Sequence, residues 1–216
     1  MENHNLIFYP KENKSAVVKS LLANRIWEKK IDLLIKKYVK CGMVCLDVGA
    51  YIGSHAKTML DLGAEVHLFE PQPLIVQCLL ATKNNNNYKK WEIHPCALSN
   101  INGKSKFNTN NDGDARFFKV SKKLWKTNFL VKTKTLDSYN FNKIDFIKID
   151  AEGSEFLILE GGKLTIENSQ PIIIIEVFNT KKNKEKLNDF ASNYNYTIES
   201  INSENYLLTP KLLKVH

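Results

Sequence analysis

The sequence predicts an α/β fold with a doubly wound, mostly parallel sheet. Short apolar runs alternate along the chain with stretches of helical period, which is typical of strands joined by crossover helices. One run, PIIIIEVF at 171–178, is apolar on both faces, as a strand in the middle of a parallel sheet is. The chain has 216 residues, of which 43% are hydrophobic, so it can bury a sizeable core. We expect residues 1–216 to form a single domain.

The N-terminal segment 1–40 is expected to be helical. In residues 16–39 apolar side chains recur at spacings of three and four, which predicts an amphipathic helix with room for one break. Cys41 and Gly42 are expected to end this helix, because glycine commonly follows the C-terminus of a helix.

The regular part of the chain is predicted to contain strands with helices between them. The strands are expected at 43–48, 65–70, 91–98, 143–150 and 171–178. The helices are expected at 54–63, 72–82, 154–166 and 184–194, with two closing strands at 196–200 and 205–210. Ser54 is expected to cap the first of these helices and Gly63 to end it. Gly161 and Gly162 are expected to interrupt the third helix.

Residues 100–135 depart from this regular pattern. They are polar and loop-rich, and they contain two strand-like runs, KSKFN and FLVKTKT. We expect this segment to form an antiparallel excursion on the substrate side of the sheet.

A glycine turn follows the first strand. In CLDVGAYIGSHAKTML at 45–60 an apolar run ends in Asp47, and Gly49 and Gly53 follow four residues apart. The G-x-G-x-x-G turn of dinucleotide folds has a different spacing, and Asp47 would repel a pyrophosphate. S-Adenosylmethionine is cationic, with a sulfonium and an ammonium group, so the acid favours it. His55, just inside the next helix, faces this turn and is expected either to contact the donor or the acceptor or to pack locally.

An acid at the end of the second strand supports an adenosine ligand. Glu70 lies 21 residues after Gly49, and an acid about 20 residues beyond such a turn accepts hydrogen bonds from ribose hydroxyls. Pro71 stiffens the next turn and is counted with Glu70 as a binding residue. S-Adenosylmethionine and NAD both contain this ribose, so Glu70 does not choose between them.

Charged residues gather where the last two long strands end. Lys148, Asp150 and Glu152 alternate along one face of a strand, and Glu176 comes near the end of the next one. Ligands of such sheets bind beyond the carboxyl ends of the strands, so we expect these side chains at the site. An unpaired buried lysine is costly, and Asp150 or Glu152 could neutralise Lys148.

Two chemical roles are open for these carboxylates. A base can take the proton of a neutral hydroxyl on the acceptor, and Asp150 or Glu152 can serve, with Lys148 tuning the pKa. Alternatively, Asp150 and Glu176 bind Mg²⁺, which takes oxygen ligands and would orient and acidify the acceptor. We favour the base, because no His-Asp-Glu ligand spacing favours a metal. A purely structural ion pair of Lys148 is the third interpretation.

Composition argues against several classes of protein. The apolar runs are too short to cross a bilayer, and the N-terminus lacks the features of a signal peptide. The four cysteines form no C-x-x-C pair, which is typical of reduced thiols in the cytosol and argues against a zinc site. We therefore expect a cytoplasmic protein without a membrane partner.

The formal net charge of +8 has two interpretations. It can signal an anionic partner such as nucleic acid. Scattered lysines beside abundant asparagine and isoleucine also result from a codon bias toward A and T, and we favour this explanation. Nucleic acid remains the less favoured partner.

Two blocks of the sequence carry a resemblance to a known family. WEKKIDLLIKKYVKCGMVCLDVGAYIGSHAKTMLDLGAEVHLFEPQP resembles the first half of the FkbM-family methyltransferases, and TLDSYNFNKIDFIKIDAEGSEFLILEGG, followed by PIIIIEV, resembles the second half. The resemblance runs from about Trp27 to Pro210. It implies a Rossmann-like class I methyltransferase fold, with a seven-stranded sheet containing one antiparallel strand, and S-adenosylmethionine as methyl donor. Family members typically methylate hydroxyl oxygens on sugars or natural products.

The resemblance also implies donor-binding positions. They are Asp47, Gly49, Ala50 and Gly53 for the methionine part, Glu70 for the ribose, and Cys96, Ala97 and Leu98 beside the adenine. The expected function is transfer of a methyl group to a hydroxyl of a sugar, a glycan or a small metabolite. An RNA methyltransferase and a non-catalytic S-adenosylmethionine-binding module are the alternatives. The acids in the 148–176 region argue against the second, because a pure binder needs none beside the methyl group.

Overall fold

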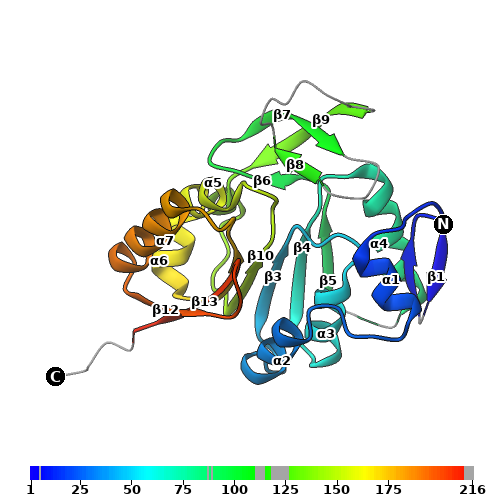
Figure 1. The fold of residues 1–216 in the computed structure, drawn as a ribbon, viewed down its shortest axis with the longest axis horizontal. Coiled ribbons are helices and arrows are strands. Elements are labelled where there is room, and N and C mark those ends of the chain that lie inside the picture. Colours follow the sequence, from blue (N-terminus) through cyan, green and yellow to red (C-terminus); the bar gives the residue numbers. More distant parts are fainter. Residues whose placement is uncertain (5, 87, 89, 110–114, 118–126, 212–216) are drawn as a thin grey trace.

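The computed structural model describes residues 1–216 apart from residues 5, 87, 89, 110–114, 118–126 and 212–216 (Figure 1). A seven-stranded sheet with the order β12-β13-β11-β10-β3-β4-β5 forms its centre. The strands are β3 (Val44–Val48), β4 (Glu65–Phe69), β5 (Trp91–His94), β10 (Phe146–Ile149), β11 (Ile172–Glu176), β12 (Tyr196–Ser200) and β13 (Asn205–Pro210). β13 runs antiparallel to its neighbours β11 and β12, and the remaining pairs are parallel. The prediction of a mostly parallel seven-stranded sheet with one antiparallel strand is confirmed.

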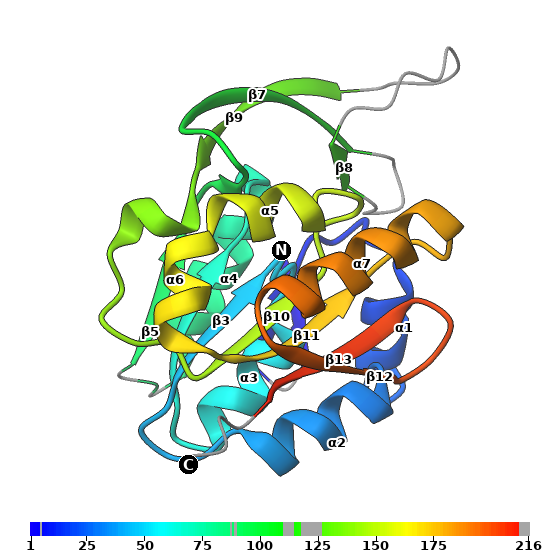
Figure 2. The same cartoon turned by 90° about the vertical axis from the view of Figure 1, so that its left-hand side faces the viewer.

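Helices cover both faces of this sheet (Figure 1, Figure 2). The helices on one face are α2 (Lys29–Tyr38), α3 (Ser54–Asp61) and α4 (Pro73–Asn85). The helices on the other face are α5 (Glu155–Gly161), α6 (Lys163–Ser169) and α7 (Lys181–Asn193). Because side chains alternate along a strand, Cys45 packs on the face covered by α2, α3 and α4, and Leu46 on the face covered by α5, α6 and α7. In the same way, Phe146 lies on the face of Cys45 and Ile147 on the face of Leu46. The sheet is therefore doubly wound, as predicted.

The N-terminal segment begins with a β-hairpin instead of a helix. Its elements are β1 (Glu2–His4), β2 (Ile7–Tyr9) and α1 (Ala16–Leu22). The hairpin is held against α4, where the Phe8 N–H donates to the Thr82 hydroxyl at 3.0 Å. The expectation of a helical segment 1–40 is correct for α1 and α2 and wrong for the hairpin. A contact with a distant helix stabilises these strands, which are too short to show a sequence pattern of their own.

The strand expected at 91–98 is divided between two sheets. β5 ends at His94 in the large sheet, and β6 (Ala97–Leu98) pairs with β9 of a second sheet. Pro95 separates them, because proline has no N–H to donate to a strand ladder. The Cys96 N–H donates to the His94 carbonyl at 2.8 Å and closes the bend. The expectation of one continuous strand is therefore wrong.

The second sheet has the order β6-β9-β7-β8 and lies beyond the ends at which the parallel strands stop (Figure 1, Figure 2). Its further strands, and the short 3-10 helix that follows, are β7 (Gly103–Thr109), β8 (Ala115–Phe117), β9 (Thr127–Lys134) and η1 (Leu136–Tyr139). β7 pairs antiparallel with both β8 and β9, as expected for the excursion at 100–135. Positions 110–114 and 118–126 of this excursion lie outside the described residues.

Glycines mark the ends of several helices. The predicted interruption at Gly161 and Gly162 is confirmed, since α5 ends and α6 begins there. The predicted cap of α3 is wrong: Gly53, at φ 81°, occupies the N-cap position, and Ser54 is the first helical residue. None of the helices in the described part of the chain is long and apolar enough to cross a bilayer.

Candidate active site

A cavity of about 690 Å³ opens where the parallel strands of the large sheet end. Its size is typical of a site for a cofactor or a small substrate. The loops after β3, β4 and β10 form part of its wall, together with β6 and the end of β11. The start of α1 and the segment before α2 complete the wall. The cavity therefore lies at the edge of the sheet where the sequence placed the ligand.

Gly49 lies where the ends of three strands meet at this cavity. The strand registers place it level with Glu70 and Asp150, the first residues after β4 and β10. Gly49 has φ 78°, and a Cβ at this position would overlap the main-chain carbonyl oxygen of Asp150. Its N–H donates to the Phe69 carbonyl at 3.0 Å. The close approach of a neighbouring strand therefore requires glycine here, a reason that the sequence spacing did not reveal.

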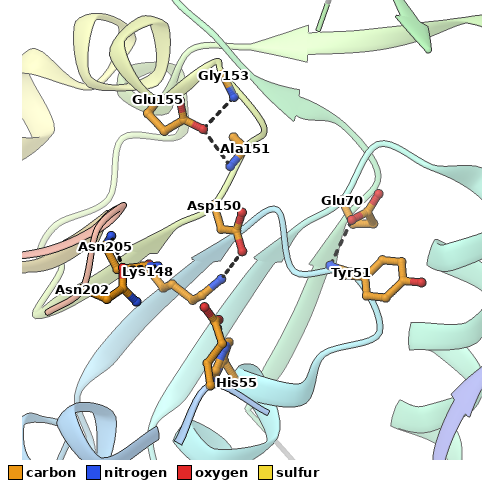
Figure 3. A network of polar contacts seen from close by, with 11 residues as sticks. Tyr51, His55, Glu70, Lys148, Asp150, Ala151, Gly153, Glu155, Asn202 and Asn205 are labelled. Atoms are coloured by element: carbon orange, nitrogen blue, oxygen red, sulfur yellow. Dashed lines mark hydrogen bonds and ion pairs between the residues drawn. The ribbon is translucent and has the colours of Figure 1, made fainter. Parts of the chain in front are cut away.

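Glu70 carries a buried carboxyl on the cavity wall (Figure 3). Its Oε2 accepts a hydrogen bond from the Tyr51 N–H at 3.0 Å, and its Oε1 accepts one from the Gln72 N–H at 2.8 Å. Burial raises the pKa of Glu70 to about 7, although both N–H donors oppose the shift. Tyr51 has φ 49°, a conformation that is uncommon without glycine, and this bend aims its N–H at Glu70.

Asp150 and Glu176 form a carboxyl pair on another part of the wall. They come from the adjacent strands β10 and β11, and their side chains are hydrogen-bonded to each other. Burial, and then the Asp150 carboxylate, raises the pKa of Glu176 to about 9. The pKa of Asp150 is lowered, because Lys148 and the bond from Glu176 outweigh the effect of burial. At neutral pH Glu176 is therefore protonated and donates to an ionised Asp150.

Lys148 is a cation buried beneath this pair, with 3% of its surface exposed. Its Nζ lies 2.9 Å from Asp150 Oδ2 (Figure 3). Burial alone would lower the pKa of Lys148, but Asp150, Asp47 and Glu28 raise it above its ordinary value. Asp47 is its neighbour in register on β3, and Glu28 is the N-cap residue of α2. The structural ion pair considered for Lys148 is therefore present, and it also fixes a carboxylate on the cavity wall.

Asp47 and His55 lie behind the cavity wall, between the sheet and α3. Asp47 is 1% exposed, and burial raises its pKa against the opposing charges of Lys148 and His55. His55 Nε2 lies 3.0 Å from Glu28 Oε2. Glu28 lines the cavity and His55 does not, so the contact of His55 with the site runs through Glu28.

The loop after β10 is held in shape by Glu155. Its Oε1 accepts hydrogen bonds from the N–H groups of Ala151 at 3.2 Å and Gly153 at 2.9 Å (Figure 3). Glu152, between these residues, has φ 52° and lines the cavity. The two acids of A-E-G-S-E therefore differ: the second organises the loop, and the first reaches the cavity wall.

The predicted site residues divide between the wall and the layer behind it. On the wall are Gly49, Glu70, Pro71, Ala97, Leu98, Asp150, Glu152 and Glu176. Behind it, buried, are Asp47, Ala50, Gly53, His55, Cys96 and Lys148. For example, Cys96 turns away from the cavity and places its Sγ 3.1 Å from the Tyr139 hydroxyl.

The sequence did not reveal how the N-terminal segment contributes to the wall. Additional wall residues include Lys14, Ser15, Trp27, Glu28 and Tyr51. The Tyr51 hydroxyl donates to Ser15 Oγ at 3.1 Å, which ties the glycine turn to the N-cap residue of α1. In the sequence, the feature that could have indicated this contribution was Tyr51, a large aromatic residue between Gly49 and Gly53.

The fold is that of the class I S-adenosylmethionine-dependent methyltransferases. The solved structure of methyltransferase FkbM from Methylobacillus flagellatus KT has the same fold, with a TM-score of 0.55 and 17% identity over 89% of this chain and 52% of that one. SMU.1697c from Streptococcus mutans, described as a methyltransferase in complex with SAH, gives a TM-score of 0.53 and 13% identity over 84% of this chain and 97% of that one. These likenesses show the fold.

Sequence comparison shows the family. The model of the methyltransferase FkbM domain matches residues 47–206, and this chain belongs to that family. The chain is also 29% identical to the 2-O-methyltransferase NoeI of Sinorhizobium fredii, over 59% of this chain and 60% of NoeI. It therefore spans about 60% of the length of this curated relative and about half of the FkbM structure. The chain therefore contains the methyltransferase FkbM domain, as the resemblance indicated.

Replacing Lys148 tests the balance of buried charge. Lys148→Met leaves Asp150 and Asp47 without their cation, and removing one partner of a buried pair costs about 3–5 kcal/mol. We expect a loss of this size in the free energy of unfolding, measured in urea at pH 7. The double variant Lys148→Met/Asp150→Asn should regain part of the loss, because it also removes a stranded charge. Equal stability of Lys148→Met and the unsubstituted chain would contradict this account of the ion pair.

Proposed function

We propose that this methyltransferase transfers a methyl group to a hydroxyl oxygen of a sugar, a glycan or another small hydroxylated compound. The observation that carries the proposal is the carboxyl pair on the cavity wall, in which Asp150 is ionised and Glu176 protonated. A neutral hydroxyl is a weak nucleophile, so an ionised carboxylate suits an alcohol acceptor. The printed name of NoeI, a 2-O-methyltransferase, agrees with this choice of atom.

The wall near Glu70 is assigned to the methyl donor. S-Adenosylmethionine supplies an activated methyl group on a positively charged sulfur. The cavity suits this cation, because Glu70 and Glu152 bring carboxyl groups to the wall. The Glu70 carboxylate can accept bonds from ribose hydroxyls, as an acid at this spacing does. Ala97 and Leu98 on β6 offer apolar surface for the adenine.

Asp150 is assigned as the group that orients the acceptor hydroxyl and accepts its proton. Its lowered pKa makes it a weak base before methyl transfer begins. The acceptor oxygen becomes strongly acidic as it gains the methyl group, so a weak base suffices at that stage. Orientation of the hydroxyl is the larger contribution expected from Asp150. Lys148 then acts as a positioning residue, since it holds Asp150 in place and ionised.

Mg²⁺ bound by Asp150 and Glu176 is the alternative role for this pair. The Lys148 ammonium, 2.9 Å from Asp150 Oδ2, would repel a divalent cation placed at the same carboxylate. Within the described ranges of the chain, no third His, Cys, Asp or Glu forms a metal-binding group with these two carboxyls. Both observations favour the base over the metal.

Selection of the acceptor is assigned to the second sheet and the N-terminal segment. β6 belongs to that sheet and lines the cavity. Residues at the start of α1 line the cavity as well. Lys14 and Lys19 are exposed on the same wall, and the net charge is +8. These cations are the observation that keeps RNA as the second candidate acceptor.

A screen of acceptors tests the proposed function. Purified protein would be incubated with tritiated methyl donor and separate panels of sugars, oligosaccharides, phenols and RNA. We expect label in carbohydrate hydroxyls, because the cavity is small and the wall carries an ionised carboxylate. Label in RNA, with binding that weakens steeply as salt rises, would support the alternative instead. Donor binding without label in any hydroxyl compound would overturn the proposal of O-methylation.

Substitutions in the carboxyl pair test the role of Asp150. Asp150→Asn keeps the size and removes the charge, so we expect turnover to fall by about 10²–10⁴-fold with little change in donor affinity. Glu176→Gln is the matched control, because an amide can donate to Asp150 as the protonated carboxyl does, and its loss should be much smaller. Kinetics and calorimetry separate turnover from binding.

Two outcomes would contradict the assignment of Asp150. Turnover of Asp150→Asn equal to that of the unsubstituted enzyme would remove it from the reaction. A chelator-treated enzyme that recovers turnover only with added Mg²⁺ would favour the metal alternative.

The raised pKa of Glu70 predicts a pH-dependent donor affinity. With a pKa of about 7, the carboxyl is protonated below pH 7 and must lose its proton to accept both ribose hydroxyls. The dissociation constant of the donor should therefore rise as pH falls from 8 to 6, approaching about tenfold per unit at the acid end. Calorimetry on Glu70→Gln serves as the reference, because it retains any titration of the donor itself. Parallel profiles for the two proteins would remove Glu70 from donor binding.

A further inference from the structure

Two histidines and a glutamate converge on the adjacent strands β4 and β5, away from the carboxyl pair. His67 Nδ1 lies 3.1 Å from His94 Nε2 and 3.4 Å from Glu92 Oε2. His94 Nε2 lies 3.9 Å from Glu92 Oε1. In the described part of the chain, this is the one group of three or more His, Cys, Asp or Glu side chains that converges in this way.

These separations match the edges of a metal coordination shell. Nitrogen and oxygen ligands lie about 2.0–2.2 Å from Zn²⁺, so two ligands of a tetrahedral ion are about 3.3–3.5 Å apart. The distances from His67 Nδ1 fall close to this range, and Glu92 can approach His94 by rotation of an exposed side chain. A hydrogen-bonded pair of histidines accounts for the 3.1 Å contact, but it leaves the converging carboxylate without a role.

Glu65 lies beside the other ring nitrogen of His67, where a metal-binding histidine usually contacts a carboxylate or a carbonyl. Its Oε1 lies 3.4 Å from His67 Nε2, on the side of the ring away from His94. A proton on Nε2, shared with this carboxylate, leaves Nδ1 with a free lone pair directed at the group. Metal ligands of this type are commonly oriented by a carboxylate in the same manner.

The two histidines are held rigidly, whereas the glutamate gives access from solvent. The side chains of His67 and His94 are 9% and 12% exposed, but that of Glu92 is 63% exposed. Phe141 packs edge-on against His67 at 4.8 Å, and Phe69 stacks on His94 at 4.5 Å. The group is therefore partly built before a metal arrives and open on one side.

We propose that His67 Nδ1, His94 Nε2 and a carboxylate oxygen of Glu92 bind a first-row divalent cation of the Zn²⁺ type. Two imidazoles and one carboxylate suit zinc, whereas Mg²⁺ prefers oxygen ligands alone. The ion takes the place of the proton between the two rings: His94 gives up its Nε2 proton and takes one at Nδ1 through solvent, so that the imidazole stays neutral, and water takes the fourth position. None of the three ligands lines the cavity, so the ion would cross-link the edge strand β5 to β4 instead of meeting the substrate.

Calorimetric titration of untagged, chelator-treated protein with Zn²⁺ tests this site. We expect one equivalent to bind, with an increase in melting temperature of about 5–10 °C at a hundredfold excess over the dissociation constant. Co²⁺ in the same titration should give the visible absorption bands of a tetrahedral ion. Mg²⁺ should produce neither the heat nor the thermal shift.

Substitutions locate the bound ion. Glu92→Gln should weaken Zn²⁺ binding at least tenfold, and its exposed side chain makes misfolding an unlikely cause of the loss. His94→Gln should abolish binding, and Glu65→Gln should weaken it about 10–100-fold by releasing the His67 ring. Glu199→Gln, on the exposed edge strand β12, is the matched control and should bind as the unsubstituted protein does. Absence of saturable Zn²⁺ binding by the unsubstituted protein would overturn the proposal. So would an affinity of Glu92→Gln and His94→Gln equal to that of the unsubstituted protein.

Discussion

A single buried lysine constrains the arrangement of this candidate active site. Lys148 lies in the central strand β10, where its charge is balanced by Asp150 beside it, Asp47 on β3 and Glu28 before α2. An unpaired ammonium in such a position would be very costly, so these carboxylates must stay together for the sheet to form. The same requirement places Asp150 on the cavity wall and keeps it ionised. Stability of the sheet and the chemistry proposed at its edge therefore involve one set of charges.

The balance of charge around Lys148 also involves the N-terminal segment, because Glu28 is one of the acids that interact with Lys148. Glu28 has φ 44°, lines the cavity and is held by His55 of α3. Further along the wall, the Tyr51 hydroxyl donates to Ser15, while the Tyr51 N–H donates to Glu70. The segment before α2 is thus linked both to the carboxyl pair and to the proposed ribose-binding acid. A ligand that contacts Glu70 would contact a turn that also holds the start of α1.

Alternation of strands and helices predicted the large sheet, because each long element carries its own periodic pattern. The structure of residues 91–98 was harder to predict, because every residue except Pro95 fits a single strand. Only the pairing of β6 with the distant β9 shows that the chain changes sheets there. The N-terminal hairpin depends in the same way on Thr82, which is far away in sequence. Both errors arise where contacts between distant segments outweigh local preference, which a local pattern does not record.

The site was predicted from the rule that ligands bind where parallel strands end, and a shift of two residues in the strand register decides how far that rule holds. Glu70 and Asp150 are the first residues after their strands, and their side chains reach the cavity. Asp47 lies one residue before the end of β3, where the alternation of side chains turns it into the helix layer beside Lys148. Gly49, the first residue after β3, is level with Glu70 and Asp150, and the main chain of Asp150 leaves no space for a side chain there. The sequence thus pointed to acids near the ends of the strands, whereas the register of the strands determines which of them line the cavity.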